Sequence, residues 1–476
     1  ILTPKEMLEG FSNKGMITVA LLFLVSEGIR QSGTLGQVIK KLLPQGKTTV
    51  FKAQLRILPS VAFISAFLNN TPVVVIFAPI IKHWAKSVNL PATKFLIPLS
   101  YVTILGGICT LIGTSTNLVV HGMILEAGFE GFSMFELGKV GIFIAIAGII
   151  YIFLFSKRLL PDARPDTAVP DEEIEEGEKF HRVEAVLGAR FPGINKKLKD
   201  FNFQRHYGAE VKEIKTRNGQ RFVTNLDDVV LHEGDTLVVM ADDTFIPTWG
   251  ESSVFVLLTN GNEPDTSGKK KRWFALLLLV LMIVGATVGE LPVTKEMFPD
   301  IKLDMFFFVS ITTIIMAWTN LFPARKYTKY ISWDILITIA CAFAISKAMV
   351  NSGVADSVAK FIIGLSDDYG PHVLLAMVFI ITNLFTELIT NNAAAALAFP
   401  LALSISAQLG VSPTPFFVVI CMAASASFST PIGYQTNLIV QGIGNYKFTD
   451  FVRIGLPLNI ITFLISVILV PLIWNF

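Results

Sequence analysis

Long apolar stretches constrain the fold of this chain more than any other feature of its sequence. Backbone groups inside a bilayer find no water to bind, so such a stretch must form a helix that satisfies its own hydrogen bonds. Hydrophobic residues make up 52% of the 476 residues and charged residues 16%, well outside the range of an average soluble domain. We therefore predict an all-α polytopic membrane protein. The stretches long enough to span include residues 16–29, 141–155, 273–288, 305–318, 331–348 and 451–474.

The same sequence argues against several other classes of protein. Its formal net charge of +2 gives no sign of a nucleic-acid partner. Cys109, Cys341 and Cys421 each lie in an apolar run without paired spacing, which predicts core residues and neither a disulfide nor a metal site. The sequence contains no pairing of a nucleophile with a base, so we expect neither an enzyme nor an organic cofactor.

The charges of the loops predict the topology. Lys and Arg gather in particular loops, which the positive-inside rule assigns to the cytoplasm. Residues 127–138, 351–370 and 408–414 are poor in both and are expected to be outside loops. The chain is thus expected to cross the plasma (inner) membrane many times. The basic residues are Lys40, Lys41, Lys47, Lys52, Arg56, Lys82, Lys86, Lys94, Lys157, Arg158, Arg164, Lys269 to Arg272, Arg325, Lys326 and Lys329.

One segment enters the membrane and returns. Residues 40–94 begin and end with basic residues on the same predicted side, although ILPSVAFISAFLNNTPVVVIFAPII between them is apolar. This pattern predicts a re-entrant hairpin with Asn69 and Asn70 near its tip. Amides are costly in apolar surroundings unless their donors and acceptors are met, so these two residues need partners or ligands.

The two halves of the chain repeat one another. With an offset of 320, residues 11–43 fall on 331–363, and TLIGTSTN at 110–117 falls on TPIGYQTN at 430–437. LNNTPVVVIFAP matches TNNAAAALAFP at an offset of 321, which predicts a second re-entrant hairpin. The copies begin on opposite sides by the charge rule. This is an inverted-topology repeat, which many secondary transporters use to place a substrate site between the halves.

The repeat also sets the expected domain boundaries. Residues 1–158 form the first membrane repeat, 159–180 an acidic linker, 181–262 a soluble insert and 263–476 the second repeat. Two helices precede the matched block in the second half, whereas only a short polar stretch precedes it in the first. We therefore expect two or more N-terminal scaffold helices to be absent from the chain as given.

Four polar breaks interrupt the apolar runs, at residues 69–71, 113–117, 390–392 and 433–437. Non-helical backbone at membrane depth survives only where it lines a cavity or is buried in protein. Each break exposes helix N-termini that attract anions and carbonyls that hold cations. No Lys or Arg lies in the breaks, so dipoles, amides and co-bound cations would hold an anion. A single Asn or Thr in a membrane helix is more often packing glue, but breaks paired by the repeat favour a transport site.

These breaks resemble those of the divalent anion/sodium symporter family, part of the ion-transporter superfamily. That family carries Ser-Asn-Thr at each of two hairpin tips, nine residues ahead of a Pro. Here Asn69-Asn70-Thr71 precedes Pro79 and Thr390-Asn391-Asn392 precedes Pro400. The spacing agrees with the family, whereas the residues at 69, 390 and 392 depart from it.

The resemblance implies an elevator mechanism, a homodimer, co-transported sodium and a set of site residues. One sodium ion would bind Ser65, Asn69, Asn70 and Gly113, and another Thr386, Asn391 and Gly433. The substrate would contact Asn69, Asn70, Thr71, Ser115, Thr390, Asn391, Asn392, Tyr434 and Gln435. Two ionisable residues near the breaks are functional suspects. The family motif includes Glu at the position of Glu387, which favours a structural role for it, and His121 is expected to pack at a helix turn.

The insert at 181–262 is predicted to be a small α+β module on the cytoplasmic side. The alternating runs AEVKEIK and DTLVVMA indicate strands, and NGQ after the first is a hairpin signal. KLKDFNFQRHYG, KTRNG and LHEGDTLVV resemble the TrkA-C type of ligand-binding module found in potassium-uptake regulators. This resemblance implies either a site for a small-molecule regulator or a structural dimer contact, and we favour the structural role.

Together these features favour a sodium-coupled importer of a small divalent anion. A sulfate-like oxyanion comes ahead of a C4-dicarboxylate, because insert-bearing relatives are commonly sulfate-type permeases and the extra Asn residues add N–H donors for a compact anion. Three alternatives stay open: a C4-dicarboxylate/sodium symporter, an oxyanion or proton antiporter, and an anion-sensing membrane receptor. The expected partners are the anion, sodium, the lipid bilayer and a second copy of the chain.

Overall fold

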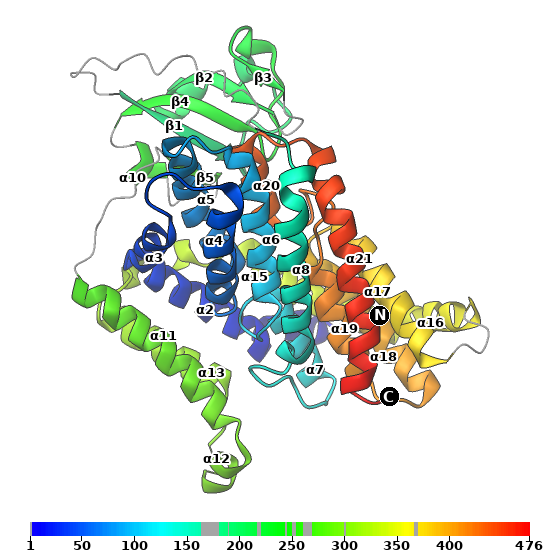
Figure 1. Cartoon of the computed structure of the whole chain (residues 1–476). Coiled ribbons are helices and arrows are strands. Elements are labelled where there is room, and N and C mark those ends of the chain that lie inside the picture. The colour runs from blue at the N-terminus through cyan, green and yellow to red at the C-terminus, as the bar shows by residue number, and fades with distance from the viewer. Residues whose placement is uncertain are drawn as a thin grey trace.

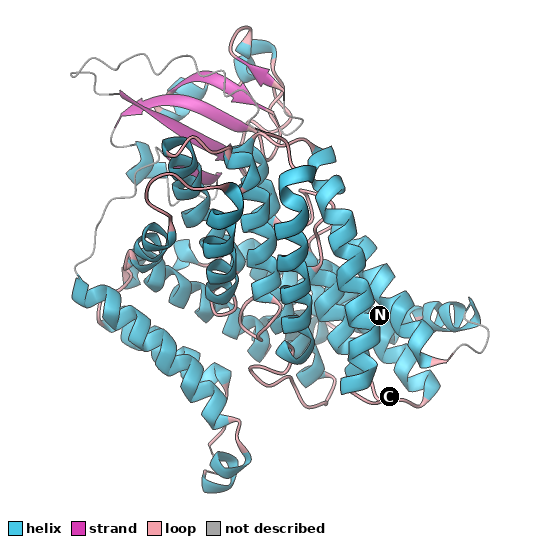
Figure 2. Cartoon of the chain, in the orientation of Figure 1, coloured by secondary structure: helices cyan, strands magenta, loops and turns pink. Residues whose placement is uncertain are grey.

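A computed structural model describes residues 2–162, 180–188, 190–216, 220–242, 245–249, 254–259, 269–298, 301–365 and 370–476. A helical body carries one small sheet at one end (Figures 1 and 2). Among the described residues, six helices are long and apolar enough to cross a membrane, or seven if one bent pair counts as a single span. The predicted class, a polytopic helical membrane protein with a small mixed insert, is confirmed.

Helices of the first half follow one another with short connections. α4 and α5 form the predicted hairpin around residues 66–69, and the helix that begins with α6 breaks at residues 108–114 before it resumes as α7. The elements are α1 (Pro4–Leu8), η1 (Glu9–Ser12), α2 (Lys14–Gln31), α3 (Thr34–Leu42), α4 (Val50–Ser65), α5 (Asn70–Ser87), η2 (Ala92–Lys94), α6 (Leu96–Gly107), α7 (Ser115–Glu126) and α8 (Gly138–Leu159).

The second half repeats this order of helices. α15 to α21 correspond in sequence to α2 to α8, so α17 and α18 form the second hairpin and α19 and α20 the second broken helix. The elements are α11 (Lys269–Gly289), α12 (Pro292–Met297), α13 (Met305–Trp318), η5 (Ala324–Lys326), α14 (Tyr327–Tyr330), α15 (Trp333–Asn351), α16 (Val354–Leu365), α17 (Pro371–Leu388), α18 (Asn391–Leu409), α19 (Thr414–Ser425), α20 (Gln435–Gly444) and α21 (Phe448–Ile473).

The same backbone device ends α2 and α15. Gly33 has φ +69° and Gly353 has φ +73°, values that favour glycine because it has no Cβ. In each case one serine separates the helix from the glycine, and the next helix begins directly after the glycine. The matched Ser-Gly pairs of the sequence therefore mark equivalent turns.

The distribution of buried residues among the helices is that expected for a protein surrounded by lipid. All twelve residues of α6 are buried, as are the residues of α19 from Pro415 onward. In contrast, α8, α11 and α21 present large apolar side chains to the outside, such as Leu154, Leu281 and Leu472. The short central helices thus form the core, and the long apolar helices surround it.

Two detailed expectations are wrong. Residues 351–370 are not a loop throughout, because α16 occupies much of the segment as the repeat partner of α3; a scarcity of Lys and Arg indicates the side of the membrane and not the secondary structure. Cys341 is exposed, whereas Cys421 is buried and Cys109 is half-buried. An apolar run in a membrane helix includes an outward face, so membership of the run does not place a residue in the core.

The insert contains a five-stranded antiparallel sheet in the order β3-β2-β4-β1-β5. Its predicted strands are β2 and β4, and β2 pairs with β3 as a hairpin whose turn at 217–219 lies outside the described residues. Most of the predicted linker, residues 163–179, lies outside them as well. The elements are β1 (Phe180–Leu187), η3 (Leu198–Asp200), α9 (Phe203–Tyr207), β2 (Glu210–Lys215), β3 (Arg221–Phe222), η4 (Leu226–Asp228), β4 (Thr236–Asp242), α10 (Phe245–Trp249) and β5 (Phe255–Thr259).

Candidate functional site

Both hairpin tips place one asparagine against a hydroxyl that precedes it by five residues. In the first hairpin the Ser65 hydroxyl lies 2.8 Å from the amide of Asn70, the first residue of α5. In the second, Thr386 Oγ1 donates to Asn391 Oδ1 at the same distance. Asn70 is completely buried and Asn391 is 7% exposed. The repeat thus builds the same contact twice at the start of a helix.

The broken helices are tied to the hairpins by equivalent hydrogen bonds. In the first half, Thr110 Oγ1 donates to the carbonyl of Ala66 and accepts from Gly113 N at 3.1 Å. In the second half, Thr430 Oγ1 donates to the carbonyl of Glu387 at 3.0 Å and accepts from Gly433 N at 3.4 Å. Each hairpin end is therefore held against the break of its own half.

Asn117 and Asn437 complete these frames. Each donates from Nδ2 to the carbonyl of the threonine that begins its motif, at 2.9 Å to Thr110 and 3.1 Å to Thr430. Sequence reasoning assigned no role to these four residues. The shared residues of TLIGTSTN and TPIGYQTN could have indicated this role. Both motifs carry a Thr and an Asn seven residues apart, and such a pair can close a loop through a hydrogen bond.

The N-termini of four helices meet across the two halves. Thr71, in the first turn of α5, lies with its hydroxyl 3.3 Å from Gln435 Oε1 at the start of α20. Asn392, in the first turn of α18, accepts at Oδ1 from Ser115 Oγ at 3.3 Å, at the start of α7. Thr116 Oγ1 donates to the same oxygen at 3.2 Å. Four partial positive charges with free N–H groups are therefore gathered in one region.

Tyr434 links the two halves at the centre of this region. Its hydroxyl lies 3.1 Å from Thr114 Oγ1 and donates to the Asn70 side-chain oxygen. The Asn70 nitrogen then donates to Gly113 O at 3.2 Å and Thr103 O at 3.0 Å. Every polar atom of the Asn70 amide thus has a protein partner. Sequence reasoning placed Tyr434 at the substrate without this connection between the repeats.

The remaining predicted residues take different positions. Asn69 and Ser115 line a small cavity between the first hairpin tip, α2 and α11. Thr390 is exposed and caps α18 by accepting from Ala393 N at 3.4 Å. Gly433 lies so close to Thr386 O and to Ser427 that a Cβ would overlap both. The cap explains the identity of Thr390, and the close approach explains that of Gly433.

Gly113 is confined in the same way as its repeat partner Gly433. A Cβ on Gly113 would lie 2.5 Å from the carbonyl oxygen of Gly107, well inside an ordinary contact. At both breaks the glycine backbone therefore lies closer to the neighbouring segment of the protein than a residue with a side chain could.

Glu387 and His121 lie outside the cluster of helix N-termini. Glu387 Oε1 accepts from Ser429 N at 2.9 Å and from Asn459 Nδ2 at 2.7 Å, which agrees with a structural role. His121 packs against Gly131, whose Cβ would overlap the imidazole ring, and it borders a wide cavity of about 1070 Å³. Lys14 and Asp304, which form an ion pair, border the same cavity at the end of the body opposite the sheet.

The cluster itself is neutral. Within the described ranges, no three His, Cys, Asp or Glu side chains come together as a metal site. A cation held here would bind hydroxyl, amide and backbone oxygens, which suits a hard ion with modest affinity. An anion would bind N–H groups and hydroxyls. A polytopic architecture and a doubled break between two halves are features that many secondary transporters share.

Comparison with known proteins places the chain in a family. A family model described as a citrate transporter matches residues 1–410 and again residues 301–476. The chain belongs to the citrate transporter family. The expected membership of the ion-transporter superfamily is thereby confirmed, and the family is one of transporters. The likeness of the insert to a TrkA-C module stays a prediction.

Two relatives match almost the whole chain, and a third matches part of it. It is 30% identical to an uncharacterized transporter of Synechocystis, over all of this chain and 91% of the relative. It is 27% identical to a putative sulfur deprivation response regulator of Chlamydomonas reinhardtii, over 98% of this chain and 94% of the relative. The sodium/sulfate cotransporter 2 of the same alga is 31% identical over 59% of this chain and 31% of the relative.

A solved structure shares the fold. The YdaH transporter of Alcanivorax borkumensis superposes with a TM-score of 0.54 at 12% sequence identity, and the match covers 98% of this chain and 86% of that one. At this identity the likeness concerns architecture alone. It agrees with the two hairpins and the two broken helices described above.

Proposed function

We propose that this citrate-transporter family member is a sodium-coupled importer of a small divalent anion, with a sulfate-like oxyanion as the preferred substrate. The observation that carries the proposal is the meeting of four helix N-termini, those of α5, α7, α18 and α20, around neutral side chains. Helix N-termini are ready-made anion sites. Relatives named sodium/sulfate cotransporters and a sodium-dependent dicarboxylate transporter of Staphylococcus saprophyticus support both the ion and the substrate class.

Sodium supplies the charge that the neutral site lacks. We assign one ion to Ser65, Asn69, Asn70 and Gly113 and another to Thr386, Asn391 and Gly433, because oxygens of both sets lie beside a hairpin tip. The second set offers an amide with fewer protein partners, since Asn391 accepts from Thr386 while the Asn70 amide is fully bonded. Two sodium ions would balance the two charges of the anion, so the membrane potential, worth about 2.3 kcal/mol per charge at about 100 mV, would cancel and the sodium concentration gradient would drive accumulation.

The preference for a compact anion rests on an asymmetry between the breaks. Thr114 and Ser115 of the first break correspond to Tyr434 and Gln435 of the second, and Tyr434 reaches across to Asn70. The larger side chains fill space that a symmetric site would leave for a second carboxylate. A tetrahedral oxyanion accepts short hydrogen bonds from all directions and fits the remaining donors.

Transport would proceed by an elevator movement in a homodimer of the inner membrane. The site-bearing helices α5, α7, α18 and α20 would move together, because the contacts between Thr71 and Gln435 and between Asn392 and Ser115 join them across the repeat. The insert would face the cytoplasm, since it lies at the end of the body that carries the basic loops. The long apolar helices α8 and α21 would face lipid.

Uptake into proteoliposomes tests this function. We expect sodium-dependent accumulation of radiolabelled sulfate that excess thiosulfate reduces more than excess succinate. Uptake of labelled succinate without sulfate uptake would contradict the substrate preference and leave sodium coupling intact. Uptake that ignores sodium but follows a proton gradient would instead support the antiporter, in which Glu387 is the carboxylate beside the breaks. Binding without counterflow would support the receptor.

A further inference from the structure

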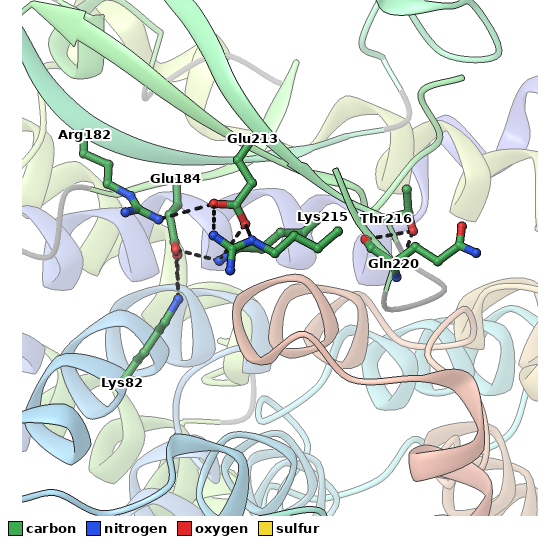
Figure 3. A network of polar contacts seen from close by, with 8 residues as sticks. Lys82, Arg182, Glu184, Glu213, Lys215, Thr216 and Gln220 are labelled. Carbon is green, nitrogen blue, oxygen red and sulfur yellow. Dashed lines mark hydrogen bonds and ion pairs between the residues drawn. The ribbon is translucent and has the colours of Figure 1, made fainter. Parts of the chain in front are cut away.

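The insert is attached to the helices that carry the candidate site. Lys82, near the end of α5, donates from Nζ to both carboxylate oxygens of Glu184 on β1, at 2.9 Å each (Figure 3). Their side chains are 22% and 17% exposed. This ion pair joins two units that are separated in the sequence and in the sheet-and-helix architecture (Figure 1).

A network behind Glu184 holds its carboxylate in place. Lys215 Nζ on β2 lies 3.3 Å from Glu184, and Glu213 contacts Arg221 at 2.9 Å and Arg182 at 3.6 Å. Burial alone raises the pKa of Glu184, but Lys82 and Lys215 outweigh it and lower the pKa to about 2. The carboxylate therefore stays charged at every physiological pH, and water screens the pair less than it screens a surface pair.

Close backbone packing accompanies the ion pair. Gly234, with φ +84°, lies against Leu438 of α20, and a Cβ there would be 2.5 Å from Leu438 Cδ1. A Cβ on Gly442 of α20 would be 2.6 Å from Thr236 Oγ1 on β4. Thr236 is completely buried. Both glycines permit an approach that a side chain would prevent, so this contact is a fitted interface.

The two helices under the module both begin at the candidate site. α5 begins at Asn70 and α20 at Gln435, where Thr71 and Gln435 lie side by side. At 1.5 Å per residue, Lys82 lies about 18 Å along α5 from the site. One helix comes from each repeat. The module therefore contacts the two helices beyond their N-terminal ends, and those N-terminal ends form part of the candidate site.

We propose that the insert is a docked regulatory module that travels with α5 and α20 during transport and holds their cytoplasmic ends together. The Lys82–Glu184 pair and the contact of Gly442 with Thr236 fasten it. Such a coupling is reciprocal, so the factor by which docking changes substrate affinity is also the factor by which substrate binding changes docking. A change at the module thus reaches the site through two rigid helices.

A reversible cross-link tests whether the module travels with these helices. The Thr236→Cys/Gly442→Cys variant, in a background where Cys109, Cys341 and Cys421 are Ala, should form a disulfide that mass spectrometry detects as one linked peptide pair. We expect the oxidised form, in which the disulfide bond replaces the close contact between Gly442 and Thr236, to transport within about twofold of the wild type, a change too small for a lost coupling. Loss of transport on oxidation that returns on reduction would overturn the proposal. The two single-cysteine variants control for the substitutions.

Charge reversal tests the ion pair without any added thiol. Glu184→Lys gathers three cations, so we expect faster hydrogen exchange at the module surface facing α5 and a KM raised about five- to tenfold, the usual size of a coupling. Adding Lys82→Glu should partly restore both. Asp228→Lys is the matched control, because Asp228 pairs with Lys197 and Lys199 on the exposed side of the module. Wild-type exchange and KM in Glu184→Lys, or an equal effect of Asp228→Lys, would overturn the proposal; the exchange readout holds whatever the substrate is.

Discussion

The two hairpin tips share a frame but differ in how their asparagines are used. At both tips a hydroxyl five residues upstream contacts the asparagine. A threonine from the break donates a hydrogen bond to a backbone carbonyl at the end of the first hairpin helix. Asn70 is completely buried and bonded on every polar atom, whereas Asn391 retains a slightly exposed amide beside Tyr434. The repeat therefore builds the same hydroxyl–asparagine contact in both halves, but the two asparagine amides differ in their other partners.

The difference arises from the residues at the breaks. Thr114 is small and stays in its own half, while Tyr434 at the equivalent position crosses to Asn70. One difference between the copies thus gives the Asn70 amide a partner from the opposite half. Under the proposed function, the first hairpin tip would be the more structural member of the pair, and the second would be the more accessible one.

Replacing each asparagine by Ala should break this comparison most clearly. Asn70→Ala removes one hydrogen-bonding partner from each of Tyr434, Gly113 and Thr103, and a buried group left unpaired costs about 1–3 kcal/mol. We expect a large fall in the melting temperature as well as loss of stabilisation by sodium. Asn391→Ala should lose the sodium response with a much smaller fall. Thermal unfolding with and without sodium measures both, and equal losses of stability in the two variants would show that the tips are equivalent.

Tyr434 should set the size of the substrate. Tyr434→Thr makes the second break match the first, so we expect sulfate affinity to fall about tenfold, or 1.4 kcal/mol, while succinate uptake rises. Tyr434→Phe keeps the volume and removes only the hydroxyl, so it should lower stability by about 1–2 kcal/mol without admitting succinate. Competition between the two labelled anions measures the change. An unchanged ratio in Tyr434→Thr would place the selectivity elsewhere.

Glu387 sharpens the comparison because its repeat partner is Ala66, which has no carboxyl group. Its carboxylate accepts hydrogen bonds from Ser429 N and Asn459 Nδ2, and a glutamine oxygen can accept both. We expect Glu387→Gln to retain uptake and its pH profile to within about twofold, since only a charge is removed from an acceptor that remains. Glu387→Ala should be less stable. A flattened pH profile in Glu387→Gln would favour the proton antiporter.

The smallest effect concerns the module, which the first hairpin contacts through Lys82 and for which the second hairpin has Leu403 at the equivalent position. The pKa of Glu184 is lowered to about 2 from an ordinary 4.5. A lowered folded-state pKa adds stability above 4.5 that is lost as the pH falls toward 2. Docking should therefore be constant from pH 8 to about 5.5, as hydrogen exchange corrected for its intrinsic rate would report. A loss of docking within that range would show that the pair of Lys82 and Glu184 does not hold the module in place.

Sequence reasoning succeeded where the information is local or periodic. The apolar runs, the doubled Asn motif and the offset of 320 predicted the helices, both hairpins and both broken helices, because each feature depends on residues close together in the chain. The alternating runs of the insert predicted β2 and β4 for the same reason. It failed for Cys341 and for α16, where the outcome depends on which face or partner a helix meets.

The sequence by itself determined that this chain is a membrane transporter with two related halves, since hydropathy and a repeated motif are properties of the letters alone. Only the tertiary structure decided how the halves meet. The contact of Tyr434 with Asn70 joins residues 364 positions apart, and that of Ser115 with Asn392 joins residues 277 apart. Such contacts depend on the packing of whole helices, and the same holds for Lys82 and Glu184, whose pairing follows from where the folded insert comes to rest on α5 and α20.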